Sequence, residues 1–499
     1  MLNPSFLFSI LWLAPCAGAA ISLVPRRGVE VVASLIAASL TVVVSLILLI
    51  VPVSGSFGYF YSDNLTRILT ITTSCIFLTS VAYSVFYINR IKEPFIRFRW
   101  YYCLLDLFAF TMLLAITVND LGIIWLAIEA TTVTSALLVA LERKRTSIES
   151  AWRYTLIVSA GLALSLFAVI LVYFSQGTLV ISKLLTEPVK NSMIMVLAVG
   201  FALIGYGTKA GIAPMHAWLP DAHSEAPSPI SALFSAVLLP TSIYAFVRIF
   251  ALLQGSPVVF SEMRNLVLGF GIFTVLIASI IIGYQRDYKR MLAYSSMENM
   301  GIILVGFSLG GIGVLGAIIQ IVAHAFAKSS AFYEAGNILV EYETTRMVDA
   351  QGVIGRLRST GYLFILSCLS ITGAPPFGVF LGEFLVLSQA VQSGNLALAV
   401  LLGFAYIYNF IGLNRQAIQL IFGKTRMGED PIRDSVQKRY ASTLNPAINS
   451  SESGSKVLEI RQENRLSVLI PLVNLVVSLV IGIYMFPAFL QAATELVHP

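Results

Sequence analysis

The stretch from Met193 to Ala213, MIMVLAVGFALIGYGTKAGIA, is long and apolar enough to cross a bilayer, yet it contains Lys209. It then breaks at Pro214 into a polar segment, PMHAWLPDAHSEAPSP, which ends at Pro229. A lysine inside a spanning helix is costly unless it is paired or faces water, so it indicates a functional group. A broken helix at membrane depth must be buried in protein or line a cavity, because lipid cannot satisfy free backbone groups. Together these two features are typical of transporters.

The composition is that of a polytopic membrane protein. Of the 499 residues, 57% are hydrophobic and 12% are charged, against about a quarter charged in soluble domains. The net charge of +6 does not indicate nucleic acid, because the placement of Lys and Arg matters more than their sum in a membrane protein. The four cysteines are scattered and form no CxxC pair, so we expect no cofactor and no metal site in this chain.

Hydropathy predicts an all-α polytopic membrane protein with about fourteen transmembrane helices. The predicted spans are 4–24, 29–52, 64–88, 101–118, 120–141, 151–174, 193–214, 228–253, 263–284, 291–310, 312–340, 362–392, 396–422 and 466–490. No basic segment precedes the first apolar run, which favours a spanning helix over a cleaved signal peptide. The eleventh and twelfth spans are long enough to contain breaks, and GAPPFG at 373–378 is expected to interrupt the twelfth.

Loop charges predict the orientation. Most of the 32 Lys and Arg residues fall in loops on one side, including the segment 423–465, which is rich in Ser, Asn, Lys and Arg. The positive-inside rule makes that side cytoplasmic and places both termini outside. The segment 423–465 is therefore predicted to be a cytoplasmic polar loop, partly disordered, that either docks a partner or is a plain linker.

Glu129 is the only charge well inside the fifth predicted helix, and a carboxylate there needs a cation or a proton. Lys209 is the obvious partner. If the two approach, Glu129 keeps Lys209 protonated; if they separate, desolvation favours loss of the proton. The alternative is a static ion pair that joins two helices.

In the eleventh helix, His324 and Lys328 are spaced i, i+4 and share one face. Histidine titrates near neutral pH, so the pair suits a proton relay, although a helix–helix hydrogen bond is the competing role for the histidine. Glu334 continues near this face. Glu298 in the tenth helix is either a half-buried relay group or an interface charge.

Glu383 follows the predicted break in the twelfth helix, as Lys209 lies beside the break in the seventh. Corresponding breaks in two halves of a chain indicate inverted repeats with ion sites between them. We therefore predict two inverted five-helix repeats, helices 4–8 and 9–13, with broken helices 7 and 12. The predicted regions are 1–100 (three helices), 101–253 and 263–422 (the repeats), 423–465 (the polar loop) and 466–499 (a C-terminal helix).

Four polar residues lie on the break after Lys209, namely His216, Asp221, His223 and Glu225. They could form a cytoplasmic entrance for ions. Capping and turn formation is the competing role for all four.

These segments together resemble the antiporter-like subunits of respiratory complex I, of multisubunit cation/proton antiporters and of membrane-bound hydrogenases. The resemblance rests on HAWLPDAHSEAPSPIS at 216–231 and DYKRMLAYSS at 287–296, and continues through His324 and Lys328 to GEFL at 382–385. It covers roughly helices four to thirteen. It implies an ion path along a polar axis, with Glu129, Lys209, His324, Lys328 and Glu383 at the family's pathway positions.

One position departs from the family pattern. Several relatives have a lysine in the eighth helix after a run like Ala236–Leu239, where this chain has Pro240. The link from Lys209 to the central axis must then use another group or water. LERKRTSIESAWRY at 141–154 and APPFG at 374–378, together with Pro240, resemble the hydrogenase-associated branch most.

The sequence thus predicts a proton- or sodium-translocating, non-redox subunit of a multisubunit redox-driven complex in a prokaryotic cytoplasmic membrane. The expected partners are other antiporter-like subunits, small membrane subunits and a hydrophilic redox module with iron–sulfur and, in a hydrogenase, nickel centres. The alternative is a subunit of a multisubunit Na⁺/H⁺ antiporter driven by ion gradients. A third possibility, a quinone-reducing cytochrome, is disfavoured because the chain offers no cysteine cluster and no evident pair of haem ligands.

Overall fold

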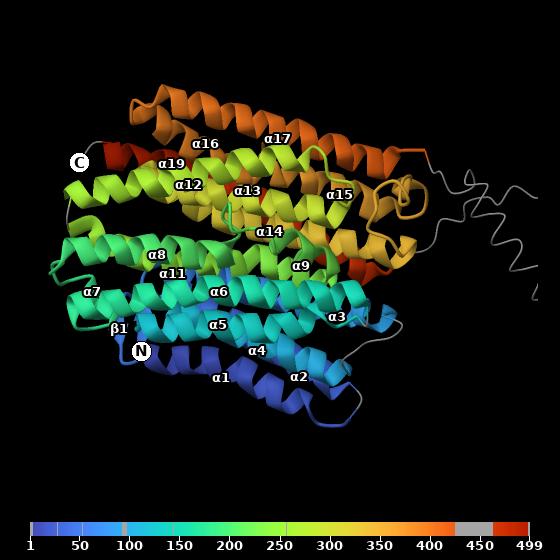
Figure 1. The fold of residues 1–499 in the computed structure, drawn as a ribbon. Coiled ribbons are helices and arrows are strands. Elements are labelled where there is room, and N and C mark those ends of the chain that lie inside the picture. Colours follow the sequence, from blue (N-terminus) through green and yellow to red (C-terminus); the bar gives the residue numbers. More distant parts are fainter. Residues whose placement is uncertain are drawn as a thin grey trace, which may run out of the picture.

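The computed structural model describes residues 3–26, 28–51, 53–91, 97–142, 144–255, 257–424 and 463–497. Long helices lie side by side and form nearly the whole of the described chain (Figure 1). A short antiparallel hairpin, β1 (Gly55–Phe57) and β2 (Phe60–Ser62), lies near one end of the bundle. Twelve helices among these residues are long and apolar enough to cross a membrane, so the chain is an integral, all-α membrane protein.

The helices of the first half are α1 (Pro4–Ser22), α2 (Val29–Ile50), α3 (Asn64–Tyr87), α4 (Phe98–Thr117), α5 (Leu121–Val139), α6 (Arg145–Gln176), α7 (Ile181–Leu184), α8 (Ser192–Ala210), α9 (Leu219–Glu225), α10 (Ser228–Leu233) and α11 (Leu239–Ala251). Those of the second half are α12 (Pro257–Ile282), α13 (Tyr288–Leu309), α14 (Ile312–Tyr342), α15 (Arg358–Ile371), α16 (Gly378–Gln392), α17 (Leu396–Phe422) and α19 (Arg465–Val497). Short 3₁₀ turns complete the set at Ile88–Arg90, Leu252–Gly255 and Val353–Gly355.

Two of the predicted spans, 291–310 and 362–392, are not among the twelve. The first corresponds to α13, a continuous helix whose mean hydropathy is lowered by polar residues such as Ser295, Glu298 and Asn299. The second is divided into α15 and α16, each too short to count as a single span. The structure therefore has a helix at every predicted span, but two of them fall below what length and hydropathy alone require of a membrane helix.

Both predicted breaks are present. α8 ends at Ala210, Gly211 has a φ of 76°, and the chain turns before α9. In the twelfth span, α15 ends at Ile371, Gly373 has a φ of 67°, and α16 starts at Gly378. By contrast, α14 runs unbroken, although its length had suggested room for a break.

The eighth span contains a distortion that the sequence analysis did not predict. Residues Phe234–Leu238 form a π-helical turn between α10 and α11, which ends two residues before Pro240. Proline has no backbone N–H to donate to the preceding turn, so a local change of winding here has a clear cause. Single π turns inside helices are frequent at functional sites.

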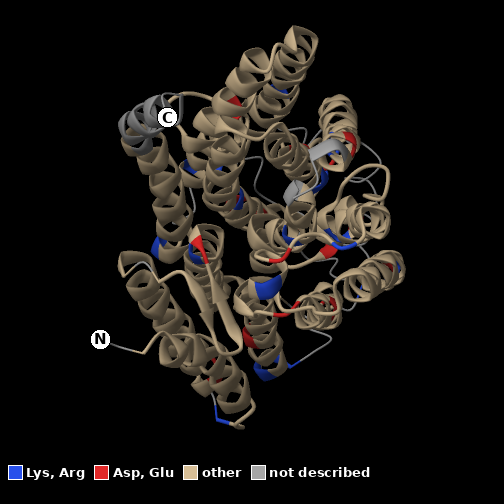
Figure 2. Cartoon of the chain, turned by 90° about the vertical axis from the view of Figure 1, so that its left-hand side faces the viewer, with Lys and Arg blue, Asp and Glu red and all other residues tan. Residues whose placement is uncertain are grey.

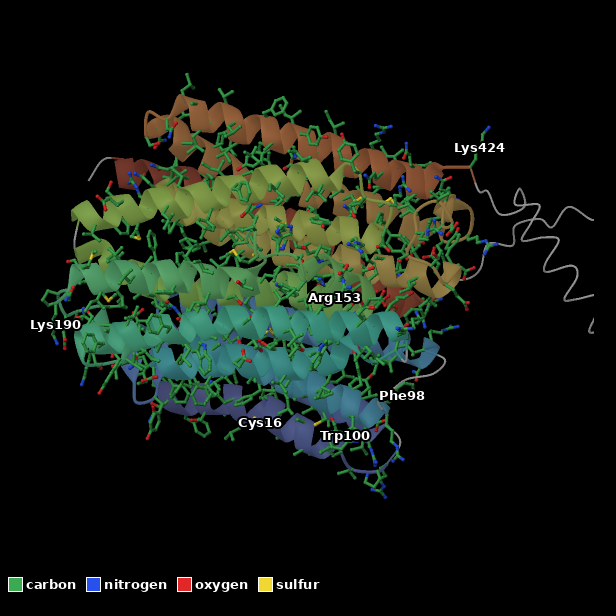
Figure 3. All side chains as sticks on the ribbon, in the orientation of Figure 1. Cys16, Phe98, Trp100, Arg153, Lys190 and Lys424 are labelled. Atoms are coloured by element: carbon green, nitrogen blue, oxygen red, sulfur yellow. The ribbon has the colours of Figure 1, made fainter. Side chains whose placement is uncertain are left out.

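The two ends of the bundle differ in which loops they carry. α1 begins and α19 ends at the same end (Figure 1), and the labels in Figure 3 place Lys190 at that end and Lys424 at the opposite one. Figure 2 shows that charged residues are few and that some lie among the helices. The predicted polar loop 423–465 falls almost wholly outside the described residues, so its predicted disorder does too.

Two local contacts fix the helices around the polar interior. A Cβ on Gly161 would lie 2.6 Å from Thr208, so the absence of a side chain lets α6 and α8 pack closely. Arg248 on α11 donates to both carboxylate oxygens of Asp63, the N-cap of α3, at 2.5 and 2.8 Å. Burial would raise the pKa of Asp63, but the hydrogen bonds and positive charge of Arg248 outweigh it and hold the pKa below its ordinary value.

Candidate functional site

Lys209 is fully buried at the end of α8, one residue before the first break. Its Nζ donates to the hydroxyl of Tyr154 at 2.6 Å and to Oγ1 of Thr132 at 2.9 Å, and lies 4.9 Å from the centre of the Tyr154 ring. The tyrosine hydroxyl is also 2.8 Å from Oγ of Ser135. A hydroxyl can accept from an ammonium or donate to a neutral amine, so this environment accommodates Lys209 in either protonation state.

Glu129 does not form the direct ion pair with Lys209 that the sequence suggested. Among the ion pairs of the described residues none joins the two. Instead, Ser159 of α6 donates to Glu129 at 2.7 Å, and Thr132, one turn along α5, takes the contact with Lys209. Glu129 is half-buried and still interacts electrostatically with Lys209, although Thr132 and Tyr154 make the direct contacts with the amine.

The break after Lys209 is held by specific hydrogen bonds. Trp218 donates through Nε1 to the carbonyl of Thr208 at 2.8 Å and packs against Tyr154, with ring centres 4.7 Å apart. The backbone N–H of Ala213 donates to Oγ1 of Thr274 on α12 at 3.1 Å. The carbonyl of Thr208 and the N–H of Ala213, both at the break, are thus satisfied inside the protein, as the membrane interior requires.

His324 and Lys328 are both fully buried on α14 and contact polar groups of neighbouring helices. Lys328 donates to the carbonyl of Leu292 at 2.6 Å and to the hydroxyl of Ser295, both on α13. Nε2 of His324 is 3.5 Å from Oγ of Ser235, which lies in the π-helical turn. The hydroxyl of Ser235 is in turn 2.6 Å from that of Ser296.

Further polar side chains on α13 continue the polar contacts of His324 and Lys328 toward the second break. Glu298 is fully buried, not half-buried, and accepts a hydrogen bond from Asn409 of α17. One of its carboxylate oxygens has no partner. Asn299, the next residue of α13, accepts a hydrogen bond from Nε2 of Gln320 on α14 at 2.6 Å. α13, α14 and α17 therefore enclose a polar region deep in the apolar bundle.

Glu383 is almost fully buried on α16, and its carboxylate folds back onto the second break. A Cβ on Gly373 would lie 2.8 Å from the carboxyl carbon of Glu383, so only glycine leaves room for the carboxylate there. No ion pair within the described residues includes Glu383. An acid and a broken helix thus meet in the twelfth span, as Lys209 and a broken helix meet in the seventh.

The structure does not bring Glu334 to Lys328. Glu334 is fully buried and accepts from Ser330 and from Ser367 of α15, each at 3.1 Å, whereas Lys328 contacts α13. The second carboxylate oxygen of Glu334 has no partner. Glu334 belongs to a separate polar contact between α14 and α15.

The four predicted entrance residues divide into two kinds. Asp221 forms ion pairs with Arg290 at 2.9 Å and with Arg153 at 3.6 Å, which tie α9 to α13 and α6. Figure 3 labels Arg153 on α6. Glu225 accepts from Thr146 and Ser147 of α6, each at 3.0 Å. Both carboxylates therefore have structural partners on neighbouring helices, and neither the entrance role nor the capping role follows from these contacts.

The two histidines of that segment differ in burial. His223 is fully buried, stacks on Phe332 with ring centres 5.2 Å apart, and has no hydrogen-bond partner on either ring nitrogen. His216 is half-buried at the break, 6.2 Å from the ring of Tyr294. His223 therefore lies inside the bundle, whereas His216 lies at its edge.

An aromatic side chain lies between the Tyr154 ring, which contacts Lys209, and the buried His223. The ring of Phe234, in the π-helical turn, has its centre 5.7 Å from that of Tyr154 and 5.7 Å from that of His223. No hydrogen-bonded chain of described side chains crosses from Lys209 to His324. Any proton moving between them must cross by water or by movement of Phe234.

Sequence reasoning missed the hydroxyl groups that hold the charged residues. Tyr154, Thr132 and Ser295 contact the two central lysines, and a signal for them existed in hydroxyl-rich runs such as TTVTS at 131–135 within apolar helices. It also did not identify Lys289 as a buried charge. Lys289 is fully buried, and its Nζ donates to the carbonyl of Ala226 at 2.5 Å.

No group of three or more His, Cys, Asp or Glu side chains within the described residues could hold a metal ion. The four cysteines are free. The polar groups of the site are thus amines, carboxylates, imidazoles and hydroxyls, which exchange protons readily.

Comparison with known proteins places this geometry in a family. The family described as NADH:quinone oxidoreductase/Mrp antiporter, TM, matches residues 118–408. The hydrogenase-4 component F homolog of Methylacidiphilum infernorum is 34% identical over 75% of this chain and 82% of its own length. The NADH-quinone oxidoreductase subunit N of Desulforudis audaxviator is 31% identical over 55% of this chain and 56% of its own length.

Solved structures share the fold over almost the whole chain. A chain of the membrane-bound sulfane sulfur reductase, an archaeal respiratory membrane complex, superposes with a TM-score of 0.82 at 20% identity, covering 99% of this chain and 97% of that one. A chain of the Mrp complex from Dietzia sp. gives 0.80 at 19% identity with the same coverage. This chain belongs to the NADH:quinone oxidoreductase/Mrp antiporter family and is an antiporter-like membrane subunit of the complex I, membrane-bound hydrogenase and Mrp type.

Proposed function

We propose that this chain translocates protons, with sodium as the alternative ion, as a non-redox subunit of a multisubunit redox-driven complex. The observation that carries the proposal is Lys209, fully buried beside a broken helix and held by hydroxyl groups with no carboxylate in contact. A lysine fixed in this way by a static role would be expected to have an ion-pair partner, because an unpaired buried charge is unfavourable. A lysine that gains and loses a proton needs neighbours that tolerate both states.

The path runs from the Lys209 group through the buried axis to the second break. Lys209 releases its proton when the charge or position of Glu129 or a neighbour changes, because the through-space attraction that favours the ammonium is then weakened. The proton passes Phe234 by way of water and reaches His324 and Lys328. Glu298, which has one carboxylate oxygen without a partner, belongs to the axis and passes the proton on toward Glu383. Glu383 is the exit.

The finer architecture belongs to the same proposal. We assign about fourteen spans, with helices 4–8 and 9–13 as inverted repeats in 101–253 and 263–422. The breaks at Gly211 and Gly373, one in each half, support this assignment. The region 1–100 then forms a three-helix unit and 466–499 a C-terminal helix. The polar loop 423–465 lies on the cytoplasmic side and both termini lie outside the prokaryotic cytoplasmic membrane, which agrees with Lys190 and Lys424 lying at opposite ends.

The partners follow from the relatives. Hydrogenase-4 components and subunits of NADH-quinone oxidoreductase are named among them. We therefore assign other antiporter-like and small membrane subunits and a hydrophilic redox module, in which iron–sulfur and, for a hydrogenase, nickel centres reside. The Mrp neighbour favours a second candidate, a gradient-driven Na⁺/H⁺ antiporter subunit.

Purification of the tagged chain from its own membranes in mild detergent separates the two candidates. Stoichiometric hydrophilic subunits with bound iron are expected for the redox-driven complex, with nickel if that complex is a hydrogenase. Small hydrophobic partners without metal would instead support the gradient-driven antiporter.

The substitution Lys209→Ala tests the ion path itself. It should abolish proton translocation in membrane vesicles while the complex still assembles, because among the described residues no other amine contacts Tyr154 and Thr132. Lys190→Ala is the matched control, since Lys190 is an exposed lysine at the end of the bundle (Figure 3). Normal translocation in Lys209→Ala would remove Lys209 from the path.

A further inference from the structure

Asp106 is a buried acid on α4 that neither the sequence analysis nor the proposed path uses. Its side chain is fully buried, and its Oδ2 accepts from Oγ of Ser34 on α2 at 2.8 Å. Its Oδ1 is buried and has no partner. A Cβ on Gly18 of α1 would lie 2.8 Å from Oδ2, so α1 packs directly over the carboxylate. Helices α1, α2 and α4 therefore enclose one acid.

Further oxygen atoms lie beside this carboxylate. Oγ of Ser22, at the end of α1, is 3.4 Å from Oγ of Ser34 and donates to the carbonyl of Glu30 at 3.3 Å. The enclosure thus offers a carboxylate, two hydroxyls and one backbone carbonyl close together. Oxygen ligands of these kinds are those that small hard cations prefer.

The charge around Asp106 is not balanced by the protein. No ion pair among the described residues includes it. The titratable side chains on the enclosing helices are Cys16 on α1, Glu30 on α2, and Arg99, Tyr101, Tyr102 and Cys103 on α4. An ionised carboxylate without a counter-charge is strongly unfavourable at full burial. Asp106 must therefore hold either a proton or a cation.

We propose that Asp106, Ser34, Ser22 and the carbonyl of Glu30 form a binding site for Na⁺, in which Na⁺ and a proton compete for the Asp106 carboxylate. When Na⁺ binds, the proton leaves the carboxylate, and the net charge of the enclosure stays the same. Na⁺ can therefore replace the proton in this fully buried site without adding a charge to the protein interior. The site lies between α1, α2 and α4. It shares no residue with the Lys209 path.

The first measurement is binding of ²²Na⁺ to the purified full complex at pH 8.5 and at pH 6.5. Binding should be present at pH 8.5 and weakened at least about tenfold at pH 6.5, because protons compete for the same carboxylate. Asp106→Asn should abolish it, since a neutral amide cannot balance Na⁺. Lys209→Ala should leave it unchanged, so that failure of this site and failure of the ion path give different results.

Two outcomes overturn the proposal. Absence of ²²Na⁺ binding in the native complex at pH 8.5 would make Asp106 a permanently protonated hydrogen-bond donor between helices. Binding that persists in Asp106→Asn would place Na⁺ elsewhere. If Asp106→Asn does not assemble, Ser34→Ala and Ser22→Ala replace it, and both should weaken ²²Na⁺ binding at least about tenfold, equivalent to a loss of roughly 1.4 kcal/mol. Unchanged binding in both serine variants would also overturn the site.

Discussion

Removal of the Tyr154 hydroxyl tests how the protein controls Lys209. In Tyr154→Phe the ring stays, so the contact between the ring and Nζ at 4.9 Å is retained, and Thr132 still accepts from Nζ. Only the hydroxyl that accepts from Nζ at 2.6 Å is lost. The change therefore removes one of the two hydrogen bonds that favour the protonated lysine.

The expected magnitude follows from that single contact. A hydrogen bond to a charged group contributes roughly 1.5–3 kcal/mol. Each 1.36 kcal/mol of preference between protonation states corresponds to about one pH unit. The neutral amine keeps a weaker hydrogen bond to the same hydroxyl, worth roughly 0.5–1.5 kcal/mol, so the preference that is lost is about 1–1.5 kcal/mol. The protonated form of Lys209 in Tyr154→Phe should thus be disfavoured by about tenfold, and the acid side of the dependence of translocation on pH should move to lower pH by about one unit.

The assay is proton translocation in membrane vesicles across a range of pH, with the complex driven by its native donor. Tyr101→Phe is the matched control, because Tyr101 is also fully buried and its hydroxyl is 2.8 Å from that of Ser84, as Tyr154 is 2.8 Å from Ser135. Both variants should lose similar stability, but only Tyr154→Phe should shift the pH dependence. An unshifted profile, or a shift to higher pH, would refute the reasoning about Lys209.

Three further predictions concern the second break and the outer contact of α3. Glu383→Gln should slow translocation about tenfold or more, equivalent to roughly 1.4 kcal/mol or more in the barrier, and an unchanged rate in vesicles would remove Glu383 from the path. Gly373→Ala should lower thermal stability and translocation by more than Gly394→Ala. At both positions the positive φ makes an alanine unfavourable by roughly 1–2 kcal/mol, but only at Gly373 would the new Cβ collide with a side chain, that of Glu383. Equal effects of the two substitutions would contradict this collision. The pKa of Asp63 is depressed, so its pair with Arg248 should stabilise the fold fully above pH about 4 and progressively less as the pH falls below that. Melting temperatures of Asp63→Asn and the native chain should therefore converge in acid, and a constant difference between them would count against the pair.

Several features were predictable because they are local in the sequence. Apolar length fixes where helices cross the membrane, and Gly and Pro fix where they stop, so the breaks at Gly211 and Gly373 were predicted correctly. An ionisable residue inside an apolar helix is energetically costly whatever the fold, so Lys209 and Glu383 could be selected as candidate site residues from the sequence. Asp106 carried the same signal in the run LLDLF and was overlooked.

Contacts between helices were less predictable. The expected pair of Glu129 and Lys209 is not a direct contact, because Thr132 and Tyr154 accept from the amine and Ser159 donates to Glu129. The hydroxyl-rich run at 131–135 marks a polar helix face but does not indicate which helix packs against it. The path role of the named residues stays a prediction. The burial of Lys289 was missed because its sequence neighbours are charged, while its actual partner, the carbonyl of Ala226, belongs to a distant helix end.

The sequence by itself determined that this chain lies in a membrane, where its helices run and break, and to which family it belongs. These depend on hydropathy, on backbone chemistry and on motif identity, all of which can be read along one dimension. Only the tertiary structure decided which groups contact Lys209, that Phe234 separates it from His223, and that Glu334 turns to α15. The physical reason is that a buried polar group takes its partner from whichever helix packs against it, and that choice depends on helix rotation and separation in space.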